Sequence, residues 1–372
     1  MRYKPLLLLL PLLMALLGLT KTGWAKTYTQ TGHGLVSYSA KAFHTVQNTN
    51  DFVTHTGTYS YSPNYQTLKT FQTTPAIYNS TGGNQAVQLA TDLFLPVSYR
   101  RSGDLGNPQS LALTPGGQSA YVMYTKTGGS KTGFIVKYNL SQLRKISHTT
   151  NNLAIIRQAT SALQKGKESS QFKAVLANIK VGPTFQTGHG QSLALNPKNN
   201  QLWFVQNPGT AGGYATVQQV AKTTLKPCTT LHFRLRSAHH NQVTMGNNLT
   251  FDRNGYAYFS SYVSGSRKLK IYRGTLNTRQ TKFKLIMQGL ANRPGTKNQS
   301  VGYNPVNNRL YFISDDAISS VPVAKLGHLK KTDVQSTTFN SGREFEGLSF
   351  DQTGRGYLIT NKGAEILTGK FS

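Results

Sequence analysis

One pattern returns five times along the 372-residue chain, and it constrains the fold more than any other feature of the sequence. It is clearest in QSLALNPKNNQLWF at 191–204. It returns as QSLALTPGGQSAYVMY from 109 and as QSVGYNPVNNRLYF from 299, and two further copies begin at Asn247 and Glu346. A catalytic motif occurs once per active site, so a pattern that recurs at long intervals indicates architecture rather than chemistry.

Each copy is typical of two strands joined by a tight turn. The first strand alternates apolar residues, as in Leu193 and Leu195, which predicts one buried face. The turn opens with a short oxygen-bearing side chain that can accept a hydrogen bond from a backbone N–H two residues on. The residues at this position are Thr114, Asn196, Asp252, Asn304 and Asp351. We therefore interpret the two aspartates as turn formers and not as metal ligands or bases.

An aromatic residue follows each turn in register. These residues are Tyr121, Trp203, Tyr258, Tyr311 and Tyr357. A third strand is visible in three copies, as GFIVKYNL (133–140), LKIYRG (269–274) and EILTG (365–369), and fourth-strand candidates follow. Four strands per unit, repeated, predict an all-β fold of the β-propeller type with five blades.

The two ends of the chain are expected to meet. Residues 26–108 match the unit poorly, and the last copy ends soon after its third strand. We expect an N-terminal strand, DLFLPVSY at 92–99, to close the ring by supplying the missing outer strand, which removes an exposed edge. Six blades are the alternative, if residues 30–85 form a degenerate blade.

Residues 139–180 differ from their surroundings. Leu153, Ile156, Ala159 and Leu163 recur at helical spacing, so we predict a helical insertion that either roofs the channel or packs on the outer rim.

Residues 1–25 have the layout of a secretory signal peptide. Arg2 and Lys4 precede an apolar run at 6–19, and cleavage is expected after Ala25. The run is short for a membrane span and contains Pro11, so we expect no transmembrane anchor. The mature chain, residues 26–372, is then a secreted single domain and a monomer. Its one cysteine, Cys228, excludes an intramolecular disulfide.

The charge is strongly positive. The chain has 41 Lys and Arg against 12 Asp and Glu, a formal net charge of +29. Such a balance implies an anionic partner. For an exported protein we expect an anionic cell-wall polymer or glycan rather than nucleic acid, and a location that is extracellular or non-covalently associated with the wall.

The repeated units resemble a known family. QSLAxNPxxxxLWF and EGLSFDxxGxGYLI are similar to the NHL- and YVTN-type bacterial propeller repeats, over about residues 88–372. As a whole the chain resembles the basic exported propeller proteins of Gram-positive lactic acid bacteria. The resemblance implies the propeller fold and no particular activity. Related propeller hydrolases use a channel carboxylate to hold Ca²⁺ or as a base.

In propellers of this kind the first strand is innermost, so its opening residue faces one end of the channel. We therefore predict a ring of ligand-binding candidates, with Arg343 close by: Gln109, Gln191, Asn247, Gln299 and Glu346. The ring could bind a sugar hydroxyl, a carboxamide or a weakly held cation. The interpretation that we favour is that these side chains join neighbouring blades, because buried polar groups need partners.

Glu346 is the one candidate for catalysis. The second acidic cluster, Asp315 and Asp316, is expected at the far end of its blade from Glu346, so we predict no metal site and no cofactor, with Ca²⁺ as the alternative. H-E-x-x-H, P-loop and G-x-S-x-G motifs are absent from the sequence. We expect a non-enzymatic, surface-associated binding protein for an anionic wall polymer or glycan. The alternative is an extracellular propeller hydrolase or lyase that acts at the channel mouth.

Overall fold

The computed structural model describes residues 26–35, 41–48, 59, 74–96, 98–100, 103–126, 130–210, 213–277 and 281–372. The predicted signal peptide, residues 1–25, lies outside the described residues. So do the side chains of Arg100 and Arg101, two adjacent basic residues.

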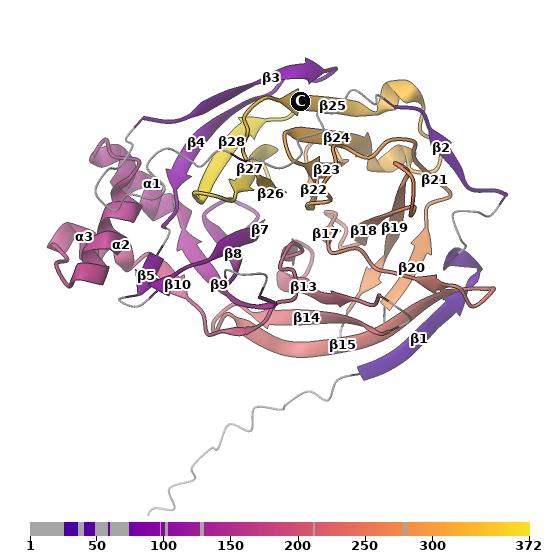
Figure 1. Cartoon of the computed structure of the whole chain (residues 1–372), viewed down its shortest axis with the longest axis horizontal. Coiled ribbons are helices and arrows are strands. Elements are labelled where there is room, and N and C mark those ends of the chain that lie inside the picture. The colour runs from indigo at the N-terminus through magenta and orange to yellow at the C-terminus, as the bar shows by residue number, and fades with distance from the viewer. Residues whose placement is uncertain are drawn as a thin grey trace, which may run out of the picture.

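Five sets of antiparallel strands surround a central axis (Figure 1). The first set is β7 (Asn107–Leu113), β8 (Ser119–Thr125), β9 (Thr132–Asn139), β10 (Ile179–Val181) and β11 (Phe185–Gln186). The second is β12 (Ala194–Asn196), β13 (Gln201–Pro208), β14 (Ala215–Ala221), β15 (Lys226–Ser237) and β16 (Gln242–Val243). The third is β17 (Thr250–Phe251), β18 (Ala257–Tyr262), β19 (Leu269–Leu276), β20 (Thr281–Leu285) and β21 (Gln288–Leu290).

The fourth set is β22 (Val301–Asn304), β23 (Arg309–Ser314), β24 (Ala317–Pro322) and β25 (Gln335–Phe339). The fifth is β26 (Phe345–Phe350), β27 (Arg355–Thr360), β28 (Glu365–Lys370) and β4 (Gln88–Phe94). The innermost strands β7, β12, β17, β22 and β26 contact one another in this order, and β26 contacts β7. The prediction of an all-β fold is therefore confirmed, and this arrangement fits a propeller-like fold in which each repeated unit supplies the two inner strands of one set.

The N-terminal part of the chain runs around the outside of this ring (Figure 1). β1 (Lys26–Gly32) pairs in parallel with β15, and β2 (His44–Val46) pairs in parallel with β21. β3 (Ile77–Gly83) lies between β25 and β4, and β4 pairs with β28 as the outer strand of the fifth set. The described residues of segment 30–85 therefore add strands to other sheets and form no sheet of their own.

The closing strand lies slightly earlier than the sequence predicts. Only the first three residues of DLFLPVSY belong to β4, and Leu95 and Pro96 leave the sheet. A short hairpin of β5 (Ser98–Arg100) and β6 (Gly103–Asp104) then leads into β7.

Three helices fill the segment between β9 and β10: α1 (Leu140–Thr149), α2 (Ile155–Lys165) and α3 (Ser170–Leu176). They lie on the outer rim and do not cover the central axis (Figure 1). Arg144 of α1 donates from Nε and Nη2 to the carboxylate of Asp92 on β4, at 2.6–3.0 Å. Arg157 of α2 is buried and donates to the carbonyls of Leu95 and Ala364, both at 3.0 Å. The insertion thus fastens the closing strand from outside.

Three short 3₁₀ helices complete the described elements, at His33–Leu35, Val323–Lys325 and Lys331–Asp333. None of the helices in the described part of the chain is long and apolar enough to cross a bilayer.

The turn residues act as the sequence predicts. Asp351 Oδ1 accepts from the backbone N–H of Thr353 at 2.9 Å, and its Oδ2 accepts from the hydroxyl of Tyr357 at 3.1 Å. Asp252 repeats the arrangement with the N–H of Asn254 at 2.9 Å and the hydroxyl of Tyr258 at 3.0 Å. The recurring turn residue and the recurring aromatic residue are therefore hydrogen-bonded to each other in these two copies.

Candidate functional site

The opening residues of the repeated units gather at one end of the channel. Glu346 Oε1 accepts a hydrogen bond from Gln109 Nε2 at 3.2 Å, and Oε2 accepts one from Gln191 Nε2 at 3.3 Å. Gln191 Nε2 also donates to Gln299 Oε1. All four side chains are buried. Four of the predicted ring residues therefore form one network that joins four strand sets, which fits the structural interpretation that we favoured for them.

Asn247 lines a cavity at this end of the channel but stands outside the hydrogen-bond network. It is half-buried, and its side chain makes no hydrogen bond within the described residues. Its neighbour Asn248 is buried and joins the inner strand to the next one, with Ser260 N donating to Oδ1 at 2.8 Å and Nδ2 donating to Ser260 O at 3.2 Å. Ser192 does the same with the backbone of Val205 at 2.8 and 3.2 Å. Asn248 thus takes the place of the serine in the QS pair.

Arg343 does not belong to the channel. It is 1% exposed and forms an ion pair with Glu365, whose Oε1 accepts from Arg343 Nε at 3.0 Å. Its other nitrogens donate to Thr360 Oγ1 at 2.7 Å and to the carbonyls of Lys362 and Gly363, both at 2.9 Å. Arg343 therefore holds the turn between β27 and β28, and it does not line the cavity that contains the ring.

Asp315 lies beside the ring, and the expectation that it lies at the far end of the blade is wrong. β23 runs antiparallel to β22, so its end returns to the level at which β22 starts. Gln299 Nε2 donates to Asp315 Oδ1 at 3.3 Å, and the hydroxyl of Tyr59 donates to Oδ2. Asp316 instead organises the loop before β26, where Gly342 N donates to its Oδ2 at 2.9 Å.

Glu344 is the third carboxylate of this region, and the sequence analysis did not single it out. It lines the same cavity as Glu346, and its Oε2 is buried without a hydrogen-bond partner among the described residues. The signal for it was the spacing E-F-E, because residues two apart on an extended chain point to the same side.

The three carboxylates hold their protons more tightly than isolated ones. Burial raises the pKa of Glu346 well above its usual value, and the charges of Glu344 and Asp315 raise it further. Burial and then the charge of Asp315 raise the pKa of Glu344. Burial also raises the pKa of Asp315, against the hydrogen bonds from Tyr59 and Gln299, which lower it. Like charges at close range cannot all ionise, so the group shares protons and titrates as a unit.

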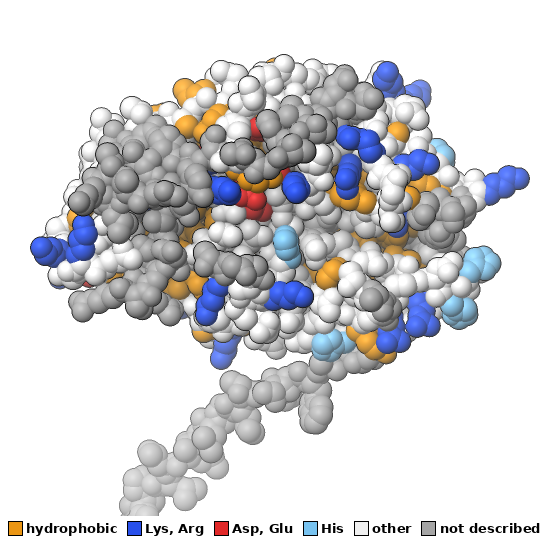
Figure 2. Space-filling view, in the orientation of Figure 1, with side chains coloured by type: hydrophobic (Ala, Val, Ile, Leu, Met, Phe, Trp, Pro, Cys, Tyr) orange, Lys and Arg blue, Asp and Glu red, His pale blue; other side chains and the backbone are white. Residues whose placement is uncertain are grey.

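Glu344 and Glu346 line a cavity of about 920 Å³, which we call the carboxylate mouth, and Asp315 accepts a hydrogen bond from Gln299 in its wall. Its lining residues include Tyr59, Gln109, Lys126, Lys131, His189, Gln191, Asn247, Lys297, Gln299, Glu344, Glu346 and Asn361. Figure 2 shows acidic side chains at the centre of this face, with basic ones around them. In a chain with 12 acidic and 41 basic residues, such a gathering of acid is a specific feature.

The stretch Gly188-His189-Gly190, before Gln191, brings the backbone of its loop close to strand β13. Gly188 and Gly190 have φ values of 63° and 81°, and a Cβ on Gly188 would lie 1.8 Å from the carbonyl oxygen of Gln206. Only glycine fits these two positions. As a result His189 is placed at the wall of the carboxylate mouth with an exposed side chain.

A metal does not fit this site. Within the described ranges, no group of three or more His, Cys, Asp and Glu side chains could hold an ion. We therefore derive no step through Ca²⁺ or any other metal.

No family model matches the chain, and no curated protein matches it. Among solved structures, it is similar to a glucose dehydrogenase (11% identity, 72% of this chain and 97% of that one, TM-score 0.35). It is also similar to the soluble aldose sugar dehydrogenase of Escherichia coli (10% identity, 77% and 100%, TM-score 0.36). A protein of unknown function from Bacteroides thetaiotaomicron is a third (11% identity, 88% and 75%, TM-score 0.41).

The expectation of a non-enzymatic binding protein for an anionic polymer is corrected by these findings. Two of the similar structures carry the names of enzymes. In addition, the channel end that was expected to hold amides and a single carboxylate holds three carboxylates, two of which, Glu344 and Glu346, line its cavity.

The expectation that no cofactor is needed is withdrawn for a related reason. Two of the similar structures are named as dehydrogenases.

Proposed function

We propose that the protein is an enzyme, a hydrolase or lyase that uses general acid–base catalysis in the carboxylate mouth on a neutral, hydroxylated substrate such as a sugar. The convergence of Asp315, Glu344 and Glu346 carries this proposal, since all three have a raised pKa and two of them line an open cavity. Carboxyl groups that share protons supply both an acid and a base at neutral pH.

The environments of the two glutamates assign their roles. Glu346 is buried, accepts from Gln109 and Gln191, and has the strongest reason to stay protonated, so it is the proton donor to a leaving oxygen. Glu344 has a carboxylate oxygen without a partner in the described chain, so it is the base that takes a proton from water or from carbon. Hydrolysis and elimination both need this pair, and the identity of the proton removed by Glu344 distinguishes them.

Binding of a hydroxylated substrate falls to the polar wall. The amide of Asn247 has no hydrogen bond within the described residues and lines the cavity, so it can both donate to and accept from a hydroxyl group. The carboxylates disfavour an anionic substrate, and the lysines of the wall disfavour a cationic one. A neutral substrate is the class that remains.

The test is turnover of a panel of neutral oligosaccharides and aryl glycosides by the wild type, Glu346→Gln and Glu344→Gln. General acid–base groups contribute about 10²- to 10⁴-fold to rate, so each variant should lose at least about 10²-fold in kcat with the fold retained. Glu168→Gln, on the segment between α2 and α3, is the matched control and should keep full activity. Wild-type turnover that survives both mouth substitutions would overturn the proposal.

We also propose that the strand sets are the blades of a five-bladed propeller that is related to the NHL and YVTN repeats and closed by β4.

We further propose that the chain is exported with cleavage after Ala25. Residues 1–25 hold three of the 41 basic residues and none of the 12 acidic ones, so the mature chain would carry a formal net charge of +26, which would keep the enzyme near an acidic cell surface. N-terminal sequencing of protein recovered from the culture medium and from a high-salt wash of the cells tests cleavage and location; an intact Met1 in both fractions would contradict the proposal.

A further inference from the structure

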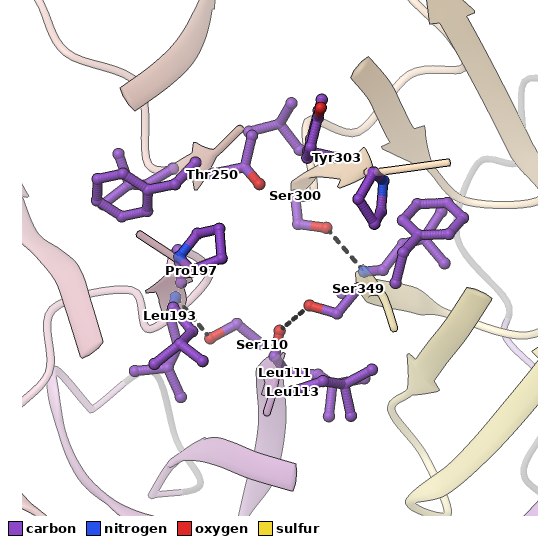
Figure 3. Close-up of a pocket in the computed structure, with 18 of the residues that line it drawn as sticks. Ser110, Leu111, Leu113, Leu193, Pro197, Thr250, Ser300, Tyr303 and Ser349 are labelled. Carbon is purple, nitrogen blue, oxygen red and sulfur yellow. Dashed lines mark hydrogen bonds between the residues drawn. The ribbon is translucent and has the colours of Figure 1, made fainter. Parts of the chain in front are cut away.

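A second chamber occupies the opposite end of the channel, and it differs in chemistry from the carboxylate mouth. It is a cavity of about 250 Å³ (Figure 3). Its walls are the alternating apolar residues of the repeated units. Each unit supplies two of them, from its inner strand or from a residue next to that strand. These are Leu111, Leu113, Leu193, Leu195, Leu249, Phe251, Val301, Tyr303, Leu348 and Phe350. Gln191 lines both cavities, so the ring of amides forms the partition between them.

Three serine hydroxyls in this chamber are already engaged with the backbone. Ser110 Oγ donates to the carbonyl of Gly190 at 2.5 Å and accepts from Leu193 N at 3.1 Å. Ser300 Oγ accepts from the backbone N–H of Leu348 at 3.2 Å, and Ser349 Oγ donates to the carbonyl of Leu111 at 2.8 Å (Figure 3). These serines join neighbouring strand sets, and a ligand in the chamber meets mainly hydrocarbon.

The outer end of the chamber is formed by the turns that follow the inner strands. Pro115, Pro197, Arg253 and Gln352 line it there and are exposed, so the chamber opens to solvent on this side. Arg253 is the only basic residue of the lining, and its guanidinium makes no hydrogen bond or ion pair within the described part of the chain. The carboxylate of Asp351, the one acid of the lining, is occupied by its own turn and by Tyr357.

We propose that this chamber binds the hydrocarbon chain of a small amphiphile whose anionic head meets Arg253. An apolar cavity of about 150 Å³ stays dry and accepts benzene, so one of about 250 Å³ has room for roughly ten carbon-sized atoms. A straight chain of about eight carbons with a carboxylate matches this volume and places its charge at the rim. The site is separate from the carboxylate mouth and does not depend on the function proposed for it.

Octanoate and 1-octanol are the probes, titrated calorimetrically into the full chain below the critical micelle concentration of octanoate. Both should bind the wild type at one site. Arg253→Gln should weaken octanoate by up to about fivefold, the upper end of the range of an exposed charge pair, and leave 1-octanol unchanged. If Arg253→Gln weakens the binding of both probes equally, or of neither, the proposed contact between Arg253 and an anionic head group is wrong.

Filling the chamber tests its location. Leu195→Trp should weaken both probes at least tenfold, while Ile77→Trp, on the exposed face of β3, adds the same side chain far from the channel and should leave binding unchanged. Pro197→Trp narrows the opening from an exposed turn, and it serves if Leu195→Trp does not fold. Absence of wild-type binding, or binding that survives a folded chamber variant, would overturn the proposal.

Discussion

Glu346→Gln should change the pH dependence of stability in a direction fixed by its surroundings. Burial raises the pKa of Glu346 in the folded chain, so the folded protein keeps this proton at pH values where the unfolded chain has lost it. The contribution of the group is fully present below the unfolded pKa, near 4.5, and is lost as the pH rises through the folded pKa. Glutamine resembles the protonated acid and does not titrate, so the variant escapes this loss.

The size of the effect follows from the hydrogen bonds and from linkage. Glu346 accepts from two amide nitrogens, at 3.2 and 3.3 Å, and the introduced amide can accept from only one of them. At pH 5 the variant should therefore be less stable than the wild type by about 1 kcal/mol. Each further pH unit below the folded pKa removes up to about 1.4 kcal/mol from the wild type alone, so the difference in stability should shift in favour of the variant as the pH rises.

The assay is urea unfolding of both proteins from pH 5 to pH 8, analysed as the difference in unfolding free energy. The difference is needed because the net charge of +29 also responds to pH, and its self-repulsion acts equally on both chains. Glu168→Gln makes the same chemical change outside the channel and should show no such trend. A Glu346→Gln difference that stays flat, or falls, as the pH rises would refute a raised pKa at Glu346.

Two further substitutions are tested by urea unfolding at constant pH. One removes the hydrogen bond between a turn residue and an aromatic residue, and the other breaks the ion pair of Arg343. Tyr357→Phe should lose about 1 kcal/mol, because it removes the hydroxyl donor to Asp351; unchanged stability would contradict the coupling of turn and aromatic residue. Arg343→Met should lose about 3–5 kcal/mol, because it leaves the buried carboxylate of Glu365 without its partner, and adding Glu365→Gln should restore part of the loss. A mild effect of Arg343→Met would mean that the ion pair contributes little.

The sequence predicted the elements that repeat. Apolar alternation located the inner strands, and the position after it supplied the turn-forming side chain, because both are local consequences of strand and turn geometry. Asp252 and Asp351 could be interpreted correctly without coordinates for this reason. The missing outer strand was also predictable, since a last unit with three strands leaves an edge that β4 covers, although β4 begins and ends a few residues earlier than expected.

The candidate site could not be predicted from the sequence in the same way, because it joins residues that are far apart in the chain. Tyr59 and Asp315 are 256 residues apart, and no local pattern places them together. Arg343 was grouped with Glu346 because the two are close in sequence, yet along an extended chain residues three apart point to opposite sides, and Arg343 faces Glu365 instead. Glu344, two residues from Glu346, was the neighbour that shares its side.

The two ends of the channel differ because one unit is repeated around an axis. A polar residue lies at or just before the start of each inner strand and apolar ones follow it, and the five strands meet the channel in the same direction, so polar residues collect at one end and apolar ones at the other. Repetition alone would produce a neutral ring of amides. Asp315 comes from the fourth unit, and the other two carboxylates arise where the last unit departs from the others, with Glu346 in place of glutamine or asparagine and Glu344 two residues before it. The departure from the repeat, rather than the repeat itself, is therefore the part of this sequence that carries chemistry.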